Sequence, residues 1–350
     1  MVCMIFYQES TFMVEFHYFR VHCPKKTQNM KSIKNDNLSR RKFLFSSGLA
    51  AASVSLLPIS CKQIGKKSEE KSNENSFEFA FLTDIHIKPE MNAPKGFQMA
   101  IDKVNALNPD FVLTGGDLVY DVMRGDYSKS EALFNLYKKM AKGFTMPVYN
   151  CIGNHDLFGI YKESPEDENH PDYKYGMWER HFGETYYSFD HKGWHFITLN
   201  SLDTTSDKKY KGYFNEAQLL WLQEDLKNVE KSTPIIITTH IPMICTYSQL
   251  NGSEGSRTVE NAAEVFKMLE THNLKLVLQG HIHWKEYGFI NDSFQFLTGG
   301  SIAGNGWKGR RHNTKEGFVK IRVDGDDFSW EYIDHGWESE RLKLAAKKTI

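Results

Sequence analysis

Aspartate, asparagine and histidine gather in short motifs that each directly follow an apolar run. The motifs are Asp84-Ile85-His86, Gly116-Asp117, Gly153-Asn154-His155-Asp156, His240 and Gly280-His281-Ile282-His283. Imidazole nitrogens and carboxylate or amide oxygens are ligands for zinc, iron and manganese. None of the motifs contains cysteine, which favours a hydrolytic metal site over a purely structural one. These residue types therefore predict metal-dependent hydrolytic chemistry.

Each motif alone carries little information. A histidine after a strand is more often a surface or core residue than a ligand, and Gly-Asp after a strand is usually a turn. Their joint occurrence is more specific, because all five follow strand-like runs. The carboxyl ends of strands in an α/β sheet form the edge where ligands bind.

Apolar runs of strand length alternate with segments of helical periodicity through the middle of the chain. We predict strands at 77–83, 110–115, 146–152, 233–239 and 274–280, and helices at 97–108, 128–143, 215–229 and 258–273. Two further runs, 185–191 and 194–200, flank a Lys-Gly turn and predict a hairpin. Such alternation indicates parallel βαβ units, and the consecutive short strands near the end indicate antiparallel pairing. The predicted fold is an α/β sandwich of two sheets with helices outside.

The motifs DIH, GGDLVY, GNHD, TTH and GHIH together resemble those of the calcineurin-like metallophosphoesterase superfamily. The resemblance covers about residues 77–335. It implies a four-layer αββα sandwich of two mixed β-sheets, with two metal ions, Fe, Mn or Zn, as cofactors. It also implies that a hydroxide bridging the metals attacks a phosphate ester, without a covalent enzyme intermediate.

The resemblance also implies a role for each motif residue. Asp84, His86 and His283 would hold the first metal, and Asp117 would bridge both metals. Asn154, His240 and His281 would hold the second metal. His155 would act as the acid or stabilise charge in the transition state, with Asp156 orienting it.

The branch within the superfamily depends on residues near these ligands. Tyr120 fits the GDxxY motif of purple acid phosphatases, in which the tyrosine is an iron ligand, but those enzymes lack the histidine of the DxH motif. His86 is present here, so the sequence is more similar to class III cyclic-nucleotide phosphodiesterases. We interpret Tyr120 as a residue at the rim of the site and as a candidate for contact with substrate. An aromatic residue packed on the edge of the sheet is the alternative. A phosphodiesterase is the first expectation, and a phosphomonoesterase of purple-acid-phosphatase type is the alternative.

Two loops are candidates for contacts with substrate. Residues 300–313 are rich in glycine and contain Trp307, Arg310 and Arg311, which offer an aromatic ring and guanidinium groups to a phosphate ester. The polar insertion 157–176 is a candidate lid or rim. An exposed, solvated loop is the plain alternative for residues 300–313.

Charge is unevenly distributed along the chain. Residues 1–61 contain eight of the 43 Lys and Arg residues and three of the 44 acidic residues, which leaves a net charge of −6 for residues 62–350. This charge disfavours duplex nucleic acid as a partner and is compatible with a small phosphate-ester substrate. A nuclease, a non-catalytic protein with the same fold and a membrane-tethered binding protein are rival hypotheses. The rivals without catalysis do not explain a complete set of ligands.

The N-terminal segment has the features of an export signal. Residues 30–61 contain Arg40-Arg41 before an apolar stretch, which predicts a twin-arginine signal and the twin-arginine export machinery as a partner. The segment ends in LPISC, so Cys61 is a candidate for lipidation and membrane attachment. Residues 62–76 would then form a flexible linker. We expect an exported bacterial protein, either periplasmic or a membrane-anchored lipoprotein.

The two ends of the chain fall outside the predicted catalytic domain. Met30 begins a complete signal sequence, so residues 1–29 are interpreted as a start-site artefact, and residues 336–350 as a C-terminal tail. A precursor with the intact mass of a chain that starts at Met1 would contradict this interpretation. Cys151 and Cys245, in the catalytic domain, lack the spacing of a metal site and are expected to be free thiols.

Overall fold

The computed structural model describes residues 75–250, 257–291 and 293–339. All described residues belong to one compact unit of the chain. The expectations for residues 1–29, for the signal at 30–61 and for lipidation of Cys61 lie outside the described residues, as does nearly all of the linker at 62–76. Within the described residues, no helix combines the length and the hydropathy that a membrane span requires.

The first sheet has five strands in the order β13-β12-β1-β2-β3. Its strands β1 (Phe77–Leu82), β2 (Phe111–Thr114) and β3 (Val148–Tyr149) run parallel. At the other side of β1, β12 (Gly317–Asp324) and β13 (Asp327–Asp334) add an antiparallel hairpin. The parallel part follows from the βαβ pattern of the sequence.

The second sheet has six strands in the order β10-β11-β9-β8-β5-β4. Its parallel centre contains β5 (Trp194–Thr198), β8 (Pro234–Thr238), β9 (Asn273–Gln279) and β11 (Phe294–Thr298). The edge strands β4 (Tyr187–His191) and β10 (Glu286–Ile290) pair antiparallel with their neighbours. The predicted hairpin across the Lys-Gly turn is confirmed as β4 and β5.

Side chains alternate between two apolar layers along the central strands. In β1, Phe77, Phe79 and Phe81 belong to the core between the sheets, whereas Ala80 and Leu82 belong to the layer under the helices. The ring of Phe79 lies 5.5 Å from that of Phe196 in β5, edge to face, which joins the two sheets. This period-two alternation with both faces buried is what a sheet between a second sheet and a helical layer requires.

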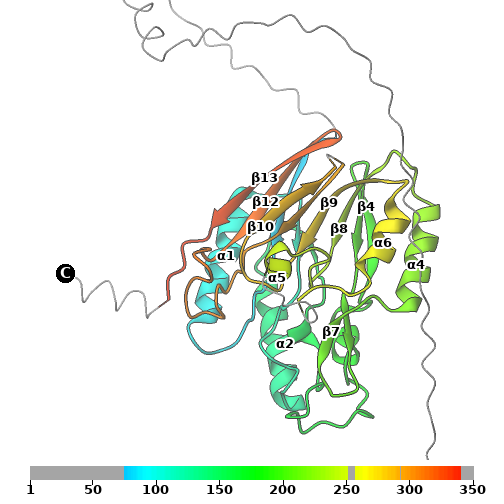
Figure 1. The fold of residues 1–350 in the computed structure, drawn as a ribbon. Helices are drawn as coiled ribbons and strands as arrows, with labels where there is room; N and C mark the ends of the chain where they lie inside the picture. Colours follow the sequence, from blue (N-terminus) through cyan, green and yellow to red (C-terminus); the bar gives the residue numbers. More distant parts are fainter. Residues whose placement is uncertain (1–74, 251–256, 292, 340–350) are drawn as a thin grey trace, which may run out of the picture. The chain divides into compact units, whose positions relative to one another are not determined.

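Helices cover the outer faces of both sheets (Figure 1). Helices α1 (Ala93–Leu107) and α2 (Tyr127–Ala141) follow β1 and β2, and α4 (Glu216–Lys227) and α6 (Ala262–Leu269) lie against the second sheet. The side chain of Asn215 caps α4 by accepting a hydrogen bond from the Gln218 amide at 2.9 Å. The predicted αββα sandwich is thus the observed arrangement.

Several elements differ from the sequence prediction. The third strand is much shorter than the predicted 146–152, because the chain leaves the sheet early to form the Asn154–Asp156 turn, a single 3₁₀ turn. The ribbon of β6 (Leu202–Thr204) and β7 (Tyr210–Gly212) and the short helices α3 (Gly176–Phe182) and α5 (Thr246–Leu250) were not predicted. Trp337, assigned to the tail, is buried and packs against Trp307.

Candidate metal centre and active site

The loops that carry the predicted ligands come from the same edge of both sheets. Asp84 and His86 follow β1, Asp117 follows β2, and Asn154 follows β3. From the second sheet, His240 follows β8, and His281 and His283 follow β9. All seven predicted ligands are therefore brought to one place at the carboxyl ends of parallel strands.

Five of these seven residues have a left-handed backbone conformation. The φ angles are 54° for Asp84, 45° for His86, 54° for Asp117, 73° for His281 and 64° for His283. Non-glycine residues adopt this region rarely, and each such residue costs on the order of 1–2 kcal/mol. Strain concentrated at one edge of a fold is typical of a functional site.

Two glycines allow the loops to approach each other. A Cβ at Gly153 would lie 2.1 Å from the Asp117 amide nitrogen and 2.3 Å from its Oδ1. Gly116 has a φ of 87°, and a Cβ there would lie 2.6 Å from Nδ1 of His240. The glycine of the Gly-Asn-His-Asp motif is thus required because Asp117 contacts it directly.

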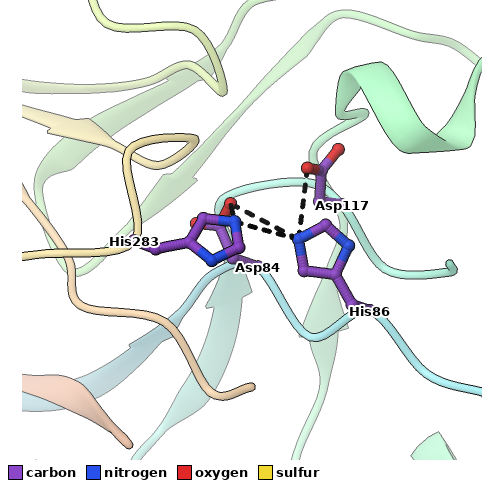
Figure 2. Close-up of side chains that lie close together, drawn as sticks. All are labelled: Asp84, His86, Asp117 and His283. Atoms are coloured by element: carbon purple, nitrogen blue, oxygen red, sulfur yellow. Dashed lines mark hydrogen bonds and ion pairs between the residues drawn. The ribbon is translucent and has the colours of Figure 1, made fainter. Parts of the chain in front are cut away.

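The first group of candidate ligands contains Asp84, His86, Asp117 and His283 (Figure 2). His86 Nε2 lies 3.0 Å from His283 Nε2 and 3.5 Å from Oδ2 of Asp117. His283 Nε2 lies 3.2 Å from Oδ1 of Asp84. The four side chains point toward one common space between the loops.

The second group contains Asp117, His240 and His281. His240 Nε2 lies 3.3 Å from the Oδ1 atom of Asp117 and 3.0 Å from the Asn154 Oδ1 atom. The same amide oxygen lies 2.9 Å from His281 Nδ1. Asp117 belongs to both groups, with one carboxylate oxygen directed to each, as the predicted bridging role requires.

Backbone carbonyls orient two of the histidines. Nδ1–H of His240 donates to the Gly115 carbonyl at 2.7 Å, and that of His283 donates to the Gly304 carbonyl. Each ring therefore directs Nε2 toward the candidate ligand cluster, where a metal ion would replace the proton on that atom. A histidine ligand is typically held in this way by its second nitrogen.

The donor set fits a pair of metal ions. The close approach of His86 Nε2 to His283 Nε2 needs a shared proton or a cation, because two lone pairs would otherwise repel. Nδ1 of His86 is buried and has no hydrogen-bond partner among the described residues. Nitrogen and oxygen donors that converge from five loops suit zinc, iron and manganese equally.

The two buried carboxylates of the cluster are held in their charged form. Burial alone would raise the pKa of Asp84 and Asp117, but the neighbouring histidines, His283 at Asp84 and His240 at Asp117, lower both pKa values below the usual range. Burial would likewise lower the pKa of His240, but contact with Asp117 raises it to about 9. Both carboxylates are thus charged at the place where cations would bind.

His155 lies beside this cluster and is oriented by the backbone. Its Nδ1 accepts a hydrogen bond from the Asp121 amide at 3.1 Å, and its ring lies 4.6 Å from that of His86. Burial lowers the pKa of His155, so the ring is neutral at neutral pH. Because Nδ1 accepts a hydrogen bond, the ring proton is on Nε2.

Asp156 contacts the backbone rather than the ring of His155. Its carboxylate accepts hydrogen bonds from the amides of Gly153, Leu118 and Val119 at 2.8, 3.2 and 3.0 Å. The expectation that Asp156 orients His155 therefore needs a correction, since Asp156 fixes the turn that carries His155 and joins it to the loop after β2. Burial and the charge of Asp117 raise the pKa of Asp156 to about 7.

Tyr120 lies at the rim, as the sequence indicated. Its side chain is 37% exposed, and its ring lies 6.1 Å from that of His155 and 6.3 Å from that of His86. The ammonium group of Lys88 lies 3.9 Å from the centre of the Tyr120 ring. Tyr120 thus separates the candidate metal centre from the surface beyond it.

The expected substrate contacts in the loop 300–313 are not supported by the positions of these residues. Trp307 is 1% exposed, so its ring cannot stack on a ligand, and its Nε1–H donates to the carbonyls of Ile85 and His86 at 3.1 Å. Arg311 lies over the Trp284 ring at 5.7 Å, and Arg310 lines a separate small cavity with Glu316 and Asp334. Trp307 therefore supports the loop that carries Asp84 and His86.

Sequence reasoning missed the backbone groups of the site. The Asp121 amide and the Gly115 and Gly304 carbonyls each fix one histidine ring. Every residue carries a backbone carbonyl, and every residue except proline carries a backbone N–H, so no side-chain pattern could identify these groups. The only available signal was position, because Asp121 closely follows Asp117, and Gly304 belongs to the glycine-rich loop.

The sequence model of the calcineurin-like phosphoesterases matches residues 77–285, well over half of the chain. The chain belongs to the calcineurin-like phosphoesterase family. It is accordingly a metallophosphoesterase, a hydrolase of phosphate esters, as the motifs predicted.

Two known proteins are similar to this phosphoesterase. It is 26% identical over 214 residues to a 3',5'-cyclic-nucleotide phosphodiesterase of Nostoc sp., covering 58% of this chain and 70% of the relative. The crystal structure of a dimetal phosphatase from Danio rerio superposes with a TM-score of 0.54 at 13% identity, covering 74% of this chain and 96% of that chain. The second likeness confirms the predicted sandwich fold.

Proposed function

We propose that this phosphoesterase is a phosphodiesterase that uses two metal ions to hydrolyse a small phosphate diester. The observation that carries the proposal is the position of Asp117, whose two carboxylate oxygens each contact a different group of candidate ligands. The similarity to a cyclic-nucleotide phosphodiesterase favours a diester over a monoester.

Each of the two metals would be bound by residues from both sheets. Asp84, His86 and His283 fit the first metal, and Asn154, His240 and His281 fit the second, with Asp117 shared. Two bound metals supply a nucleophile from water at neutral pH and neutralise charge on the phosphoryl oxygens. The buried carboxylates and oriented imidazoles would hold the metals in place before substrate binds, so the positive charge of the site is preorganised.

The neutral ring of His155 carries its proton on Nε2 and can therefore act as a hydrogen-bond donor. With Nδ1 accepting from the Asp121 amide, Nε2–H is free to donate to a phosphoryl or leaving-group oxygen. In the overall reaction water adds to phosphorus, one P–O ester bond breaks, and the departing alcohol oxygen takes up a proton. His155 would stabilise the charge that develops on oxygen during this step.

The experiment that tests this proposal begins with protein stripped of metal and reloaded with Mn, Zn or Fe. Bis-p-nitrophenyl phosphate and p-nitrophenyl phosphate are then assayed side by side. Faster metal-dependent cleavage of the diester supports the proposal. Faster cleavage of the monoester would instead support the phosphomonoesterase alternative, and no cleavage with two bound metals would favour a non-catalytic protein.

The Asp117→Asn variant tests the bridging role. Loss of one shared negative charge should lower turnover by about 100-fold or more, and the metal content of the chain should fall below two ions. Asp102→Asn, at an exposed position of α1, is the matched control and should change neither quantity. Near-normal turnover and two metals in the Asp117 variant would overturn the assignment.

We also propose that the protein is exported as a folded unit and held at a membrane through a lipid on Cys61. The support is the order of Arg40-Arg41, the apolar stretch and the cysteine in the sequence. The twin-arginine route carries folded proteins, so the metals could be loaded before export.

A further inference from the structure

A large cleft opens beside the candidate metal centre, between residues 88–91 and helix α2. Its volume is about 760 Å³, and its lining includes Lys88, Met91, Tyr120, Ala132, Leu133 and Leu136. This volume is within the range of about 300–1,000 Å³ that is typical of small-molecule sites. None of these residues is a candidate metal ligand.

The cleft and the metal centre share a wall. Tyr120 lines the cleft, and its ring lies 6.1 Å from that of His155. Asp121 also lines the cleft, and its amide is the group that orients His155. A molecule bound with its phosphoryl group at the metals could therefore extend past Tyr120 into the cleft.

Large apolar side chains are exposed on the walls of this cleft. Met91 is 42% exposed and Tyr120 is 37% exposed, and both line the cleft. Leu133 and Leu136 contribute partly buried side chains from α2. Binding of an apolar ligand in such a concave site is favourable, because it removes this apolar surface from water.

The cations of the cleft differ in how they are paired. Arg124 contacts Asp121 at 2.9 Å, and Lys129 contacts Asp126 at 3.1 Å. Lys88 is 6% exposed, and no carboxylate of the described residues lies within 4.0 Å of its ammonium group, which faces the Tyr120 ring. A buried cation without an ion pair, next to the metal centre, is suited to an anionic ligand.

We propose that the cleft binds an extended apolar or aromatic group of the substrate, and that Lys88 binds the negative charge of the same substrate where the cleft meets the metal centre. The substrate class is thus a phosphoester of a bulky apolar alcohol, not of a compact polar one. This inference rests on the proposed function, because it places the phosphoryl group at the metals.

The test compares octylphosphonate and methylphosphonate, which carry the same anion but different apolar groups. Their dissociation constants are measured by titration calorimetry on the full, metal-loaded protein. We expect octylphosphonate to bind at least about tenfold tighter, since each buried methylene group adds to affinity. The Ala132→Trp variant places an indole in the cleft and should reduce this preference to about twofold or less.

The matched control is Ala217→Trp, because both alanines are exposed on helices but Ala217 is on α4 and does not line the cleft. This control should retain the full preference for octylphosphonate. Equal affinity of the two phosphonates for the parent protein, or an unchanged preference in Ala132→Trp, would overturn the proposal. Unfolding temperatures of both variants show whether the tryptophans disturb the fold.

Lys88 is tested by Lys88→Met, which keeps the length of the side chain and removes its charge. Both phosphonates should bind about tenfold more weakly, while their ratio stays as in the parent protein. Lys95→Met, at an exposed position of α1, should have no effect. Unchanged affinity in Lys88→Met would remove Lys88 from the proposal.

The two proposals fail in different ways. Turnover of bis-p-nitrophenyl phosphate by the parent protein reports on the proposed function, whereas the ratio of phosphonate affinities reports on the cleft. Turnover without a preference for octylphosphonate would contradict only the cleft. If the parent protein shows no turnover, the proposed function is contradicted. The substrate assignment, which rests on it, is then contradicted too, whatever the ratio of phosphonate affinities.

Discussion

At the residue scale, the candidate centre depends on how each imidazole is held. His240 and His283 donate Nδ1–H to backbone carbonyls, whereas His155 accepts a backbone amide at the same atom. This difference leaves Nε2 of the first two rings available as a ligand atom and puts a proton on Nε2 of the third ring. The same residue type thus provides both ligands and a donor because the backbone differs around it.

The first residue-scale prediction concerns His155. His155→Gln removes the oriented Nε2–H donor and leaves every candidate metal ligand unchanged in sequence. We therefore expect kcat to fall by about 100–10,000-fold. The metal content and the unfolding temperature should stay near those of the parent protein. His312→Gln, at an exposed position, is the control. A kcat within about threefold of the parent value would show that His155 has no part in the chemistry.

The side-chain part of the site could be predicted from the sequence, and the backbone part could not. Asp84, His86, Asp117, Asn154, His240, His281 and His283 were identified because ligands must be particular residue types. Trp307 was misassigned because a tryptophan near a glycine-rich loop looks the same whether it stacks on substrate or packs inside. Only burial, which depends on the tertiary fold, separates these two cases.

At the element scale, helix α1 is fixed against the loop 300–313 by a glycine. A Cβ at Gly96 would lie 2.2 Å from Cζ3 of Trp307 and 2.8 Å from Cδ1 of Trp337. Trp307 in turn holds the carbonyls of Ile85 and His86. The position of α1 is therefore linked to that of the first candidate ligands.

Gly96→Ala tests this link. Alanine favours a helix by up to about 1 kcal/mol over glycine, but overpacking against two tryptophans should cost about 1–3 kcal/mol. We expect a lower free energy of unfolding in a denaturant titration, together with weaker metal binding. Gln98→Ala on the exposed side of the same helix should change stability by less than about 0.5 kcal/mol. A stabilised Gly96→Ala protein would contradict the observed packing.

The second element-scale prediction concerns pH and the contact between β5 and α4. His195 in β5 lies 3.0 Å from Oδ2 of Asp225 in α4 and 2.7 Å from Oδ1 of Asp190. Burial alone would lower the pKa of His195, but its hydrogen bonds to Asp225 and Asp190 raise it above the usual value. This contact thus stabilises the fold fully below the unfolded-state pKa of about 6.5.

The stabilisation should be lost as pH rises through the higher pKa of the folded state. Unfolding titrations of the parent protein and His195→Gln at about pH 5.5 and about pH 8.5 measure this effect. We expect the difference in free energy of unfolding between the two proteins to be larger at the lower pH. An equal or larger difference at the higher pH would contradict the assigned direction.

Elements with clear periodicity were predicted well, and elements that depend on tertiary contacts were not. The β4–β5 hairpin and α4, with its Asn215 cap, agree with local patterns. The third strand is cut short because Gly153 must approach Asp117, a contact 36 residues apart in sequence. The β6–β7 ribbon pairs polar segments that have no strand-like apolar pattern.

At the whole-molecule scale, the candidate centre joins the two sheets. Asp84, Asp117 and Asn154 come from the first sheet, whereas His240, His281 and His283 come from the second. A metal bound by both sets would bind only the folded arrangement. Metal should therefore stabilise the folded protein by mass action.

Metal removal tests this coupling. With free metal at about 100 times its dissociation constant, the stabilisation should be about 2.7 kcal/mol per site, so chelation should lower Tm by several degrees. Adding Mn or Zn back should restore Tm in the parent protein but only partly in Asp117→Asn. A Tm that does not respond to chelation of a protein shown to lose two metals would contradict the coupling.

Export is tested by replacing Arg40 and Arg41 together with lysine. Because the twin-arginine machinery recognises the arginine pair, this change should keep the protein in the cytoplasm. Fractionation of the bacterial cell measures the distribution. Cys61→Ser should release the exported protein from the membrane fraction, and an unchanged distribution of either variant would contradict its part of the proposal.

The left-handed backbone at five candidate ligands has a consequence for the evolution of this family. Asparagine and aspartate tolerate this conformation better than most residues, and glycine adopts it freely. A lineage can therefore exchange Asp84 or Asp117 for asparagine or glycine and lose the chemistry while keeping the loops. Descendants that retain the fold but only recognise ligands are accessible in single steps, whereas new catalytic residues at these positions are restricted by the inherited backbone.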